Sequence, residues 1–273
     1  MAAVLGRIGT ALRLREDHMA YTIALAGKGG VGKTTITGML VKYLAEKTKS
    51  IILAVDADAN SNLNEVLGVE IEATLGDIRE QLENNESKQV VPPGVDKAAW
   101  TELQLSGALS EGDDFDLLVM GRTQGKGCYC FVNGLLTTQI QRYTNNYQYI
   151  VVDNEAGLEH LSRGLLPKVD TLILVSDSSR RGVQAAGRIY ELAQSLNLGA
   201  KEIKLIINRA PNGIAPQGAL EEAEKFGLDV LGVLPQNDEI FELDGEGKPT
   251  AGVTMDNEFK KALYALLDKM SFK

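Results

Sequence analysis

Cysteine and histidine are scarce in this sequence of 273 residues, which contains two of each. Two cysteines are too few for the dense disulfide framework of small secreted proteins, so we expect a reducing, cytoplasmic setting. The histidines are His18 and His160, and neither lies in a pattern typical of a nucleophilic triad. We expect His160 to be a packing or switch residue, and we look for a reaction that depends on positioning and charge stabilisation instead of a covalent relay.

Long apolar runs and an excess of positive charge are also absent. The sequence has no apolar run of the roughly 18 residues that suggest a membrane-spanning helix. Its formal net charge of −9 argues against general binding of nucleic acids, because such binding depends on many contacts between Lys or Arg and phosphate groups. We therefore expect a globular protein without nucleic-acid partners and without stable association with a membrane.

Residues 1–18, with the sequence MAAVLGRIGTALRLREDH, precede the first segment that resembles a strand. Met19 follows directly and is the favoured native start, which makes this leader non-native or non-essential. The alternative is a short amphipathic targeting helix, because three arginines alternate with apolar residues and acidic residues come late. We exclude the leader from the fold and treat residues 19–273 as a single domain.

From Tyr21 onward, short aliphatic runs alternate with segments of helical periodicity. Continuous apolar runs are typical of strands that are buried on both faces. Their alternation with helices indicates an α/β fold, with a doubly wound, mainly parallel sheet and helices on both faces. The apolar runs are YTIALA, SIILAVDAD, FDLLVMG, YQYIVVD, TLILVSD, IKLIINR and DVLGVLP.

Apolar residues repeat with helical spacing in three segments, and we expect the last of these to pack on the sheet. The polar stretch from about Glu70 to Gly112 is weakly patterned, and we expect it to form helices and loops over one edge of the sheet. The three apolar stripes are Ile36, Met39, Leu40, Tyr43 and Leu44; Ile189, Leu192, Ala193 and Leu196; and Phe259, Leu263, Leu266, Leu267 and Met270.

A glycine-rich segment, GKGGVGKT at residues 27–34, follows the first apolar run and opens the first helical stripe. It fits the pattern G-x-x-x-x-G-K-[ST] of phosphate-binding loops (P-loops). This pattern is expected between a strand and a helix, as it is found here. The glycines let backbone N–H groups turn toward phosphate oxygens, and the helix N-terminus adds a favourable partial charge. Lys33 is expected to reach the β- and γ-phosphates of ATP, and the Thr34 hydroxyl to ligate Mg²⁺. The expected contacts with ATP or ADP are Gly27, Lys28, Gly29, Gly30, Val31, Gly32, Lys33, Thr34 and Thr35.

Lys28, directly after the first glycine, gives this segment a resemblance to the deviant Walker A motif. That motif marks the ATPase family of nitrogenase iron protein, the septum-site and partition ATPases and arsenite-pump ATPase. The resemblance implies that Lys28 crosses a nucleotide-sandwich homodimer and touches the phosphates of the partner subunit. Such a cation stabilises transition-state charge as an arginine finger does, and it makes dimerisation depend on the nucleotide.

Two later apolar runs end in acidic residues, in VDADAN and VVDNEAGLEH, as expected at the carboxyl edge of a parallel sheet. Asp56 is the first of these residues, and a helix N-cap is an alternative role for it. The resemblance implies that Asp58 orients the attacking water and that Asp153 holds Mg²⁺ through water. It also implies that the amide of Gly157 senses the γ-phosphate.

Two further residues are assigned to the base of the nucleotide by the same resemblance. Asn208 ends the run IKLIIN, and the family pattern implies that it contacts adenine. Pro235 lies in LPQNDEI, which is similar to the loop that covers the base. The expected catalytic residues are thus Lys28, Lys33, Asp58 and Asp153, and the expected base contacts are Asn208 and Pro235.

Both cysteines lie in the segment GKGCYC, as Cys128 and Cys130. A disulfide between positions i and i+2 is disfavoured by cross-link geometry, and a tetrahedral thiolate site needs four ligands where one chain offers two. In the homodimer that the resemblance implies, a patch on the two-fold axis meets its own copy, so two chains together provide four thiolates. This C-x-C, the phosphate loop and DNEAGLEHLSRG together resemble the carbon monoxide dehydrogenase and acetyl-CoA synthase maturation ATPases, the CooC/AcsF nickel-insertion family.

This resemblance implies an ATP-dependent metallochaperone whose cargo at Cys128 and Cys130 is nickel or, because thiolates also favour it, zinc. The implied partners are a second copy of the chain and a client enzyme, either carbon monoxide dehydrogenase or acetyl-CoA synthase. One alternative is an iron–sulfur electron donor like nitrogenase iron protein, which carries a second cysteine where this chain has Glu155-Ala156-Gly157. Another alternative is a positioning ATPase of the septum-site or partition type.

Overall fold

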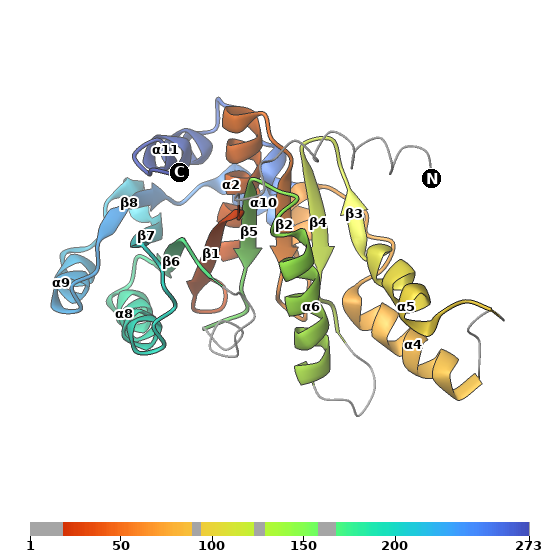
Figure 1. Cartoon of the computed structure of the whole chain (residues 1–273). Coiled ribbons are helices and arrows are strands. Elements are labelled where there is room, and N and C mark those ends of the chain that lie inside the picture. Colours follow the sequence, from red (N-terminus) through yellow and green to blue (C-terminus); the bar gives the residue numbers. More distant parts are fainter. Residues whose placement is uncertain (1–18, 89–93, 123–128, 158–167, 273) are drawn as a thin grey trace.

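The sheet at the centre of the chain has eight strands in the order β3-β4-β2-β5-β1-β6-β7-β8 (Figure 1). The computed structural model describes residues 19–88, 94–122, 129–157 and 168–272, so the leader lies outside the described residues. Neighbouring strands are parallel, except that β3 is antiparallel to β4. The prediction of a mainly parallel, doubly wound sheet is confirmed.

All seven predicted strands are present, and an eighth strand, β3, lies at one edge of the sheet. β3 has the sequence LSE, which contains no aliphatic run by which it could be predicted. The strands are β1 (Tyr21–Gly27), β2 (Ile52–Asp56), β3 (Leu109–Glu111), β4 (Phe115–Val119), β5 (Tyr149–Asp153), β6 (Thr171–Asp177), β7 (Glu202–Ala210) and β8 (Val230–Pro235).

Helices follow most of the strands, and the polar stretch after Glu70 forms two of them, α4 and α5, before it enters β3. Both helices lie beside the β3–β4 edge of the sheet, as expected (Figure 1). The helices are α2 (Lys33–Thr48), α3 (Leu63–Leu67), α4 (Leu75–Lys88), α5 (Lys97–Ser106), α6 (Tyr129–Tyr143), α8 (Arg180–Ser195), α9 (Gln217–Lys225), α10 (Asp238–Gly245) and α11 (Glu258–Leu267), with 3₁₀ turns at η1 (Pro211–Gly213) and η2 (Thr250–Gly252).

Side chains of each strand alternate between two apolar layers. In β1, Ile23 and Leu25 belong to the layer that includes residues of α2 and α11. Ala24 and Ala26 belong to the opposite layer, which includes residues of α6 and α8. All four side chains are fully buried. Burial on both faces explains why the strands are continuous apolar runs and not alternating ones.

The C-terminal helix α11 packs against β8 and α2 (Figure 1). Its predicted apolar stripe is buried from Phe259 to Met270, so the expectation that this stripe packs on the sheet is confirmed. The helix therefore contributes its apolar face to the core. Within the described part of the chain, no helix is both long and apolar enough to span a lipid bilayer.

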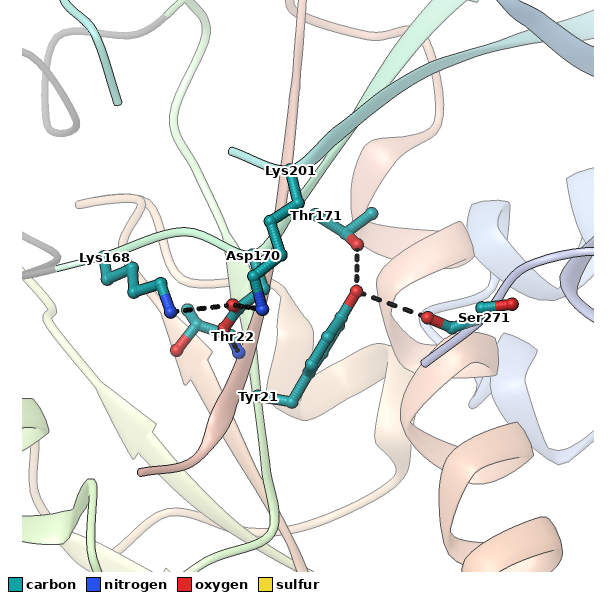
Figure 2. Close-up of polar contacts among 7 residues, drawn as sticks. All are labelled: Tyr21, Thr22, Lys168, Asp170, Thr171, Lys201 and Ser271. Carbon is teal, nitrogen blue, oxygen red and sulfur yellow. Dashed lines mark hydrogen bonds and ion pairs between the residues drawn. The ribbon is translucent and has the colours of Figure 1, made fainter. Parts of the chain in front are cut away.

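Asp170 joins three segments at the amino edge of the sheet, as Figure 2 shows. Its Oδ2 accepts the backbone N–H of Thr22 at 3.1 Å. Its Oδ1 lies 3.2 Å from Nζ of Lys168 and 3.0 Å from Nζ of Lys201. Burial by itself would raise the pKa of Asp170, but the hydrogen bond from Thr22 and the two ammonium groups outweigh it and lower the pKa. This carboxylate is satisfied entirely by its own chain.

The end of the described chain is fastened at the same edge. The hydroxyl of Tyr21 lies 2.7 Å from Oγ1 of Thr171 and donates to the carbonyl of Ser271 (Figure 2). The hydroxyl of Tyr149 donates to the carbonyl of Phe272 at 3.1 Å. The ring of Phe272 lies edge-on to that of Tyr21. These contacts hold the segment after α11 against the first and fifth strands.

Candidate nucleotide site

The phosphate loop lies between β1 and α2, at the carboxyl edge of the sheet. β1 is flanked by β5 on one side and by β6 on the other, and the strand order changes direction there. In doubly wound sheets, ligands bind at this edge beside such a point. The glycine-rich segment therefore occupies the position where the fold places a nucleotide.

The loop keeps one of its two lysines inside and presents the other to solvent. Gly32 precedes α2 with φ of 90°, a left-handed conformation that favours glycine. A β-carbon at Gly32 would also lie only 2.5 Å from Nδ2 of Asn208. Lys33 begins α2 and is buried, and its ammonium group donates to the carbonyl of Lys28 at 3.3 Å. The side chain of Lys28 is exposed.

Asp153 ends β5 beside the first turn of α2. Its Oδ1 accepts the hydroxyl of Thr37 at 3.1 Å. Burial raises the pKa of Asp153 to about 6, although the hydrogen bond from Thr34, the charge of Lys33 and the hydrogen bond from Thr37 act to lower it. The structure thus brings together Thr34 and Asp153, the two residues that the sequence assigns to Mg²⁺.

Asp56 lies beside Asp153 in the parallel register of β2 and β5. Burial raises the pKa of Asp56 to about 7, and the charge of Asp153 adds to this effect. Its carboxylate accepts the backbone N–H groups of Asp58, Asn62 and Leu63, each at 3.0 Å, so it caps the start of α3. Two neighbouring carboxylates whose ionised forms are disfavoured make a donor set that fits a hard divalent cation such as Mg²⁺.

The residues assigned to water positioning and γ-phosphate sensing are engaged by the chain itself. Oδ1 of Asp58 accepts the backbone N–H of Asn60 at 2.8 Å and its Nδ2 at 3.1 Å. The N–H of Gly157 donates to the carbonyl of Gly27 at 3.1 Å, which brings Gly157 against the phosphate loop. A γ-phosphate could receive this N–H only in exchange for the carbonyl of Gly27.

A cavity of about 220 Å³ opens beside the phosphate loop. Asn208 and Pro235 both line it, together with Gly32 and Thr35. The amide of Asn208 is fixed, because its Nδ2 donates to the carbonyl of Val31 at 2.9 Å. The two residues assigned to the base therefore share one cavity with the loop assigned to the phosphates.

Other residues of this cavity were not named from the sequence, although Asn237 lies in the segment LPQNDEI that was assigned to the base. Arg209 has φ of 55° at an irregularity of the pairing between β7 and β8, and its Nη1 donates to the carbonyl of Gly30 at 2.8 Å. Asn237 caps α10 by accepting the N–H of Ile240 at 3.0 Å, and its place before two acidic residues is a recognisable helix-start signal. Phe241 lines the cavity with 72% of its surface exposed, which no sequence pattern indicates.

The predicted metal ligands are not tested by this geometry. Cys128 lies outside the described residues, and so does the side chain of Cys130, which is near the start of α6. His160 lies outside them as well. Among the side chains that are described, no three His, Cys, Asp or Glu residues come together as metal ligands. The shared thiolate site stays a prediction.

The chain matches a family model and several known proteins. The model described as the CobQ/CobB/MinD/ParA nucleotide binding domain matches residues 22–250. An uncharacterized ATP-binding protein of Methanocaldococcus jannaschii is 43% identical over 91% of this chain and 97% of its own length. The carbon monoxide dehydrogenase accessory protein CooC of Rhodospirillum rubrum is 30% identical over 82% of this chain and 87% of its own length. The septum site-determining protein MinD of Pyrococcus horikoshii, solved with Mg-ADP, shares the fold with a TM-score of 0.69 at 22% identity, over 92% of this chain and 96% of that chain.

Proposed function

The chain belongs to the CobQ/CobB/MinD/ParA family of nucleotide-binding domains, and from this premise we propose that it is an ATPase that delivers a metal ion. The proposed cargo is nickel, inserted into carbon monoxide dehydrogenase or acetyl-CoA synthase, and the working unit is a homodimer. The observation that carries the proposal is the pair Cys128 and Cys130, the only cysteines of a chain with an ATP-type phosphate loop. Similarity to CooC, an accessory protein of carbon monoxide dehydrogenase, supports it.

ATP hydrolysis is proposed to use the residues at the carboxyl edge. The ammonium group of Lys33 exchanges the carbonyl of Lys28 for the β- and γ-phosphates. Mg²⁺, bound by the hydroxyl of Thr34 and through water by Asp153, would neutralise charge on the phosphate oxygens. Asp58 orients the water that attacks the γ-phosphorus, the bond to the β–γ bridging oxygen breaks, and ADP and phosphate are released.

The base of the nucleotide is proposed to occupy the cavity of about 220 Å³ beside the phosphate loop. Asn208 and Pro235 line this cavity, and the exposed ring of Phe241 offers a face on which an adenine can stack. Since Asn208 also holds the carbonyl of Val31, one residue connects the base to the phosphate loop. This arrangement supports a nucleotide that bridges the cavity and the loop.

Dimerisation is proposed to depend on Lys28 and on nucleotide. The side chain of Lys28 is exposed beside the phosphate loop, so a second chain can approach it. A cation supplied in trans to the γ-phosphate stabilises the transition state and adds a contact between the two chains while ATP is bound. Metal shared between the chains should promote dimerisation without nucleotide as well. The N–H of Gly157 donates to the carbonyl of Gly27, and we propose that it binds the γ-phosphate in exchange for this carbonyl.

Metal is proposed to bind between the two chains, with Cys128 and Cys130 of each contributing thiolates. Four thiolates suit zinc and other borderline or soft divalent ions. Coordination requires the thiols to lose protons, so metal affinity falls as pH falls. Hydrolysis of ATP, by opening the dimer, would divide the four ligands into two pairs and release the ion to the client enzyme.

The alternative functions have less support in the residues. An iron–sulfur donor is disfavoured because Glu155-Ala156-Gly157 contains no cysteine. A septum-positioning ATPase remains the second candidate, since the likeness to MinD extends over the whole fold. The apolar stripe of α11, however, is buried in the core and is not free to contact a membrane. A partition ATPase would carry basic residues for DNA, against the net charge of −9.

The proposal is tested by titrating the full-length protein with nickel or zinc while sulfur-to-metal charge-transfer absorbance and the sedimentation coefficient are recorded. We expect one metal ion per two chains, and we expect Cys128→Ala or Cys130→Ala alone to abolish the site, because each change removes two of four ligands. Lys33→Ala is the matched control, since it leaves both cysteines in place and should bind metal normally. One ion per chain, independent of protein concentration, would refute a shared site.

A further inference from the structure

Gly121 and Arg122 follow β4 in a segment that is held tightly against its neighbours. The N–H of Met120 donates to the carbonyl of Asp56 at 2.9 Å, which continues the pairing of β4 with β2. Gly121 has φ of 68°, and a β-carbon there would lie 2.2 Å from Oγ1 of Thr74. A left-handed backbone packed this closely requires glycine. The backbone of Arg122 is therefore fixed beside the end of β2.

From this position Arg122 reaches the loop that carries Asp58. Its Nη2 donates to Oδ1 of Asn60. Nδ2 of Asn60 donates in turn to Oδ1 of Asp58 at 3.1 Å, and the backbone N–H of Asn60 donates to the same oxygen at 2.8 Å. A guanidinium group only donates hydrogen bonds. It therefore fixes the Asn60 amide with its oxygen toward Arg122 and its nitrogen toward Asp58.

We propose that Arg122 is a positioning residue for ATP hydrolysis that acts through Asn60 on the carboxylate of Asp58. Both hydrogen bonds from Asn60 reach Oδ1, so Oδ2 is the oxygen that accepts a hydrogen bond from the attacking water. Without Arg122 the Asn60 amide can turn over, and its oxygen would then face the carboxylate as a second acceptor. The carboxylate would lose its fixed orientation, and the water would be oriented less well. This role rests on the proposed function, in which Asp58 orients the attacking water during ATP hydrolysis.

The first test measures hydrolysis of MgATP by the full-length protein, from which bound transition metals have been removed with a chelator and the chelator by dialysis. Arg122→Ala should lower kcat about tenfold, the effect of losing one charge-assisted hydrogen bond, with the Kd for ATP unchanged because Asp58 orients water and not the nucleotide. Arg122→Lys, which keeps a cationic donor, should recover part of the rate. Arg188→Ala, which removes an exposed arginine of α8, is the control and should behave as wild type.

The second test asks whether Arg122 acts through Asp58. In an Asp58→Ala background, Arg122→Ala should cause no further loss of kcat, because the residue at the end of the relay is already absent. The melting temperatures of all variants are recorded, so that a folding defect is distinguished from a kinetic one. A wild-type kcat in Arg122→Ala, or a full additional tenfold loss in the Asp58→Ala background, would overturn the positioning role.

Asp58→Ala alone separates a failure of this role from a failure of the proposed function. A wild-type kcat in Asp58→Ala would remove the water-positioning role that the proposed function gives to Asp58, whereas a slow Asp58→Ala beside a wild-type Arg122→Ala would overturn only the role of Arg122.

Discussion

Asp170 at the amino edge of the sheet and Asp153 at its carboxyl edge are both buried carboxylates, yet their pKa values shift in opposite directions. Asp170 is held by two lysines and a backbone N–H, and its pKa is lowered (Figure 2). Asp153 lies beside a second buried carboxylate, Asp56, and burial raises the two pKa values to about 6 and about 7. Buried negative charge is therefore balanced by cations of the chain at the amino edge, whereas at the carboxyl edge two buried carboxylates lie beside each other.

The difference indicates that the amino edge stabilises the fold by itself, whereas the carboxyl edge has charged groups that a ligand can balance. At the amino edge the cations that balance Asp170 are part of the chain, so the contact adds to stability without a ligand. At the carboxyl edge Lys33 is the buried cation beside Asp153, and its hydrogen bond is to a loop carbonyl. Buried charges without a balancing charge commonly lower the stability of a folded protein, and functional sites keep them because ligand binding requires them.

The largest expected effect is on ATP affinity, which should depend on Lys33 at the carboxyl edge and not on Lys201 at the amino edge. Lys33→Ala should weaken ATP binding about a thousandfold, because the β- and γ-phosphates lose their main cation and its charge-assisted hydrogen bonds. Lys201→Ala, which removes a lysine from the amino edge, should bind ATP as wild type does. Calorimetric titration measures the ATP affinity of both variants. Micromolar affinity in Lys33→Ala would contradict the assignment of Lys33 to the β- and γ-phosphates.

A second effect distinguishes the two lysines within the phosphate loop. Lys28→Ala should retain the ATP affinity of the monomer but lose ATP-dependent dimerisation, with turnover reduced roughly a hundredfold or more, because the cation supplied in trans is absent. Size-exclusion chromatography with ATP and with a non-hydrolysable analogue measures the first property, and phosphate release the second. Lys269→Ala on the exposed surface is the control. Normal dimerisation of Lys28→Ala would make Lys28 an ordinary surface residue.

A third effect concerns stability at the carboxyl edge without ligand. The folded pKa of Asp153 is raised to about 6, so its ionisation costs stability as pH rises from about 4 through 6. Asp153→Asn removes this cost and keeps an acceptor oxygen for Thr37. At pH 8, in chelator, the variant should be more stable than wild type by about 1–3 kcal/mol, with no gain at pH 4. Urea denaturation at both pH values decides this, and equal stability at pH 8 would contradict it.

The smallest expected effect is a loss of stability on substitution of Asp170 at the amino edge, opposite in sign to the gain expected for Asp153→Asn. Because the pKa of Asp170 is lowered in the folded state, its contribution is present above the unfolded pKa of about 4 and is lost as pH falls through the folded value. Asp170→Asn should therefore destabilise the protein at pH 7 by about 1 kcal/mol, after screening of the exposed lysines. The difference from wild type should shrink toward pH 3. A loss of stability of equal size at pH 7 and pH 3 would indicate that Asp170 stabilises the fold through packing and not through its charge.

The fold was predictable because burial on both faces makes each parallel strand a continuous apolar run. Two local features were not. β3 pairs only at the sheet edge and carries the sequence LSE, so it has no apolar signal. Leu192 was assigned to the apolar stripe of α8 but is 42% exposed. Ala193 of the predicted stripe is buried, but the rest of the buried face of that helix includes the small residues Gly182, Ala186 and Gly187, which give only a weak hydrophobic signal.

The position of the phosphate loop between β1 and α2 was predictable, because one short motif contains the glycines of a turn that follows a strand and opens a helix. Asn208 and Pro235 were linked to the base by resemblance, and the structure places both beside the loop. Arg209 and Arg122 were not foreseen, because each acts on a segment that is distant in the chain. Arg209 donates to the carbonyl of Gly30, and Arg122 donates to the side chain of Asn60. Such pairings depend on strand order, which a local pattern does not contain.

The central claim is that ATP and metal act on one homodimer. It is tested most directly by measuring zinc or nickel affinity through charge-transfer absorbance, with and without a non-hydrolysable ATP analogue, beside analytical ultracentrifugation. We predict that the analogue tightens metal binding about tenfold or more, and that metal tightens binding of the analogue by the same factor, because coupling between two sites is reciprocal. Equal metal affinity with and without the analogue, on a species that stays monomeric, would contradict the account.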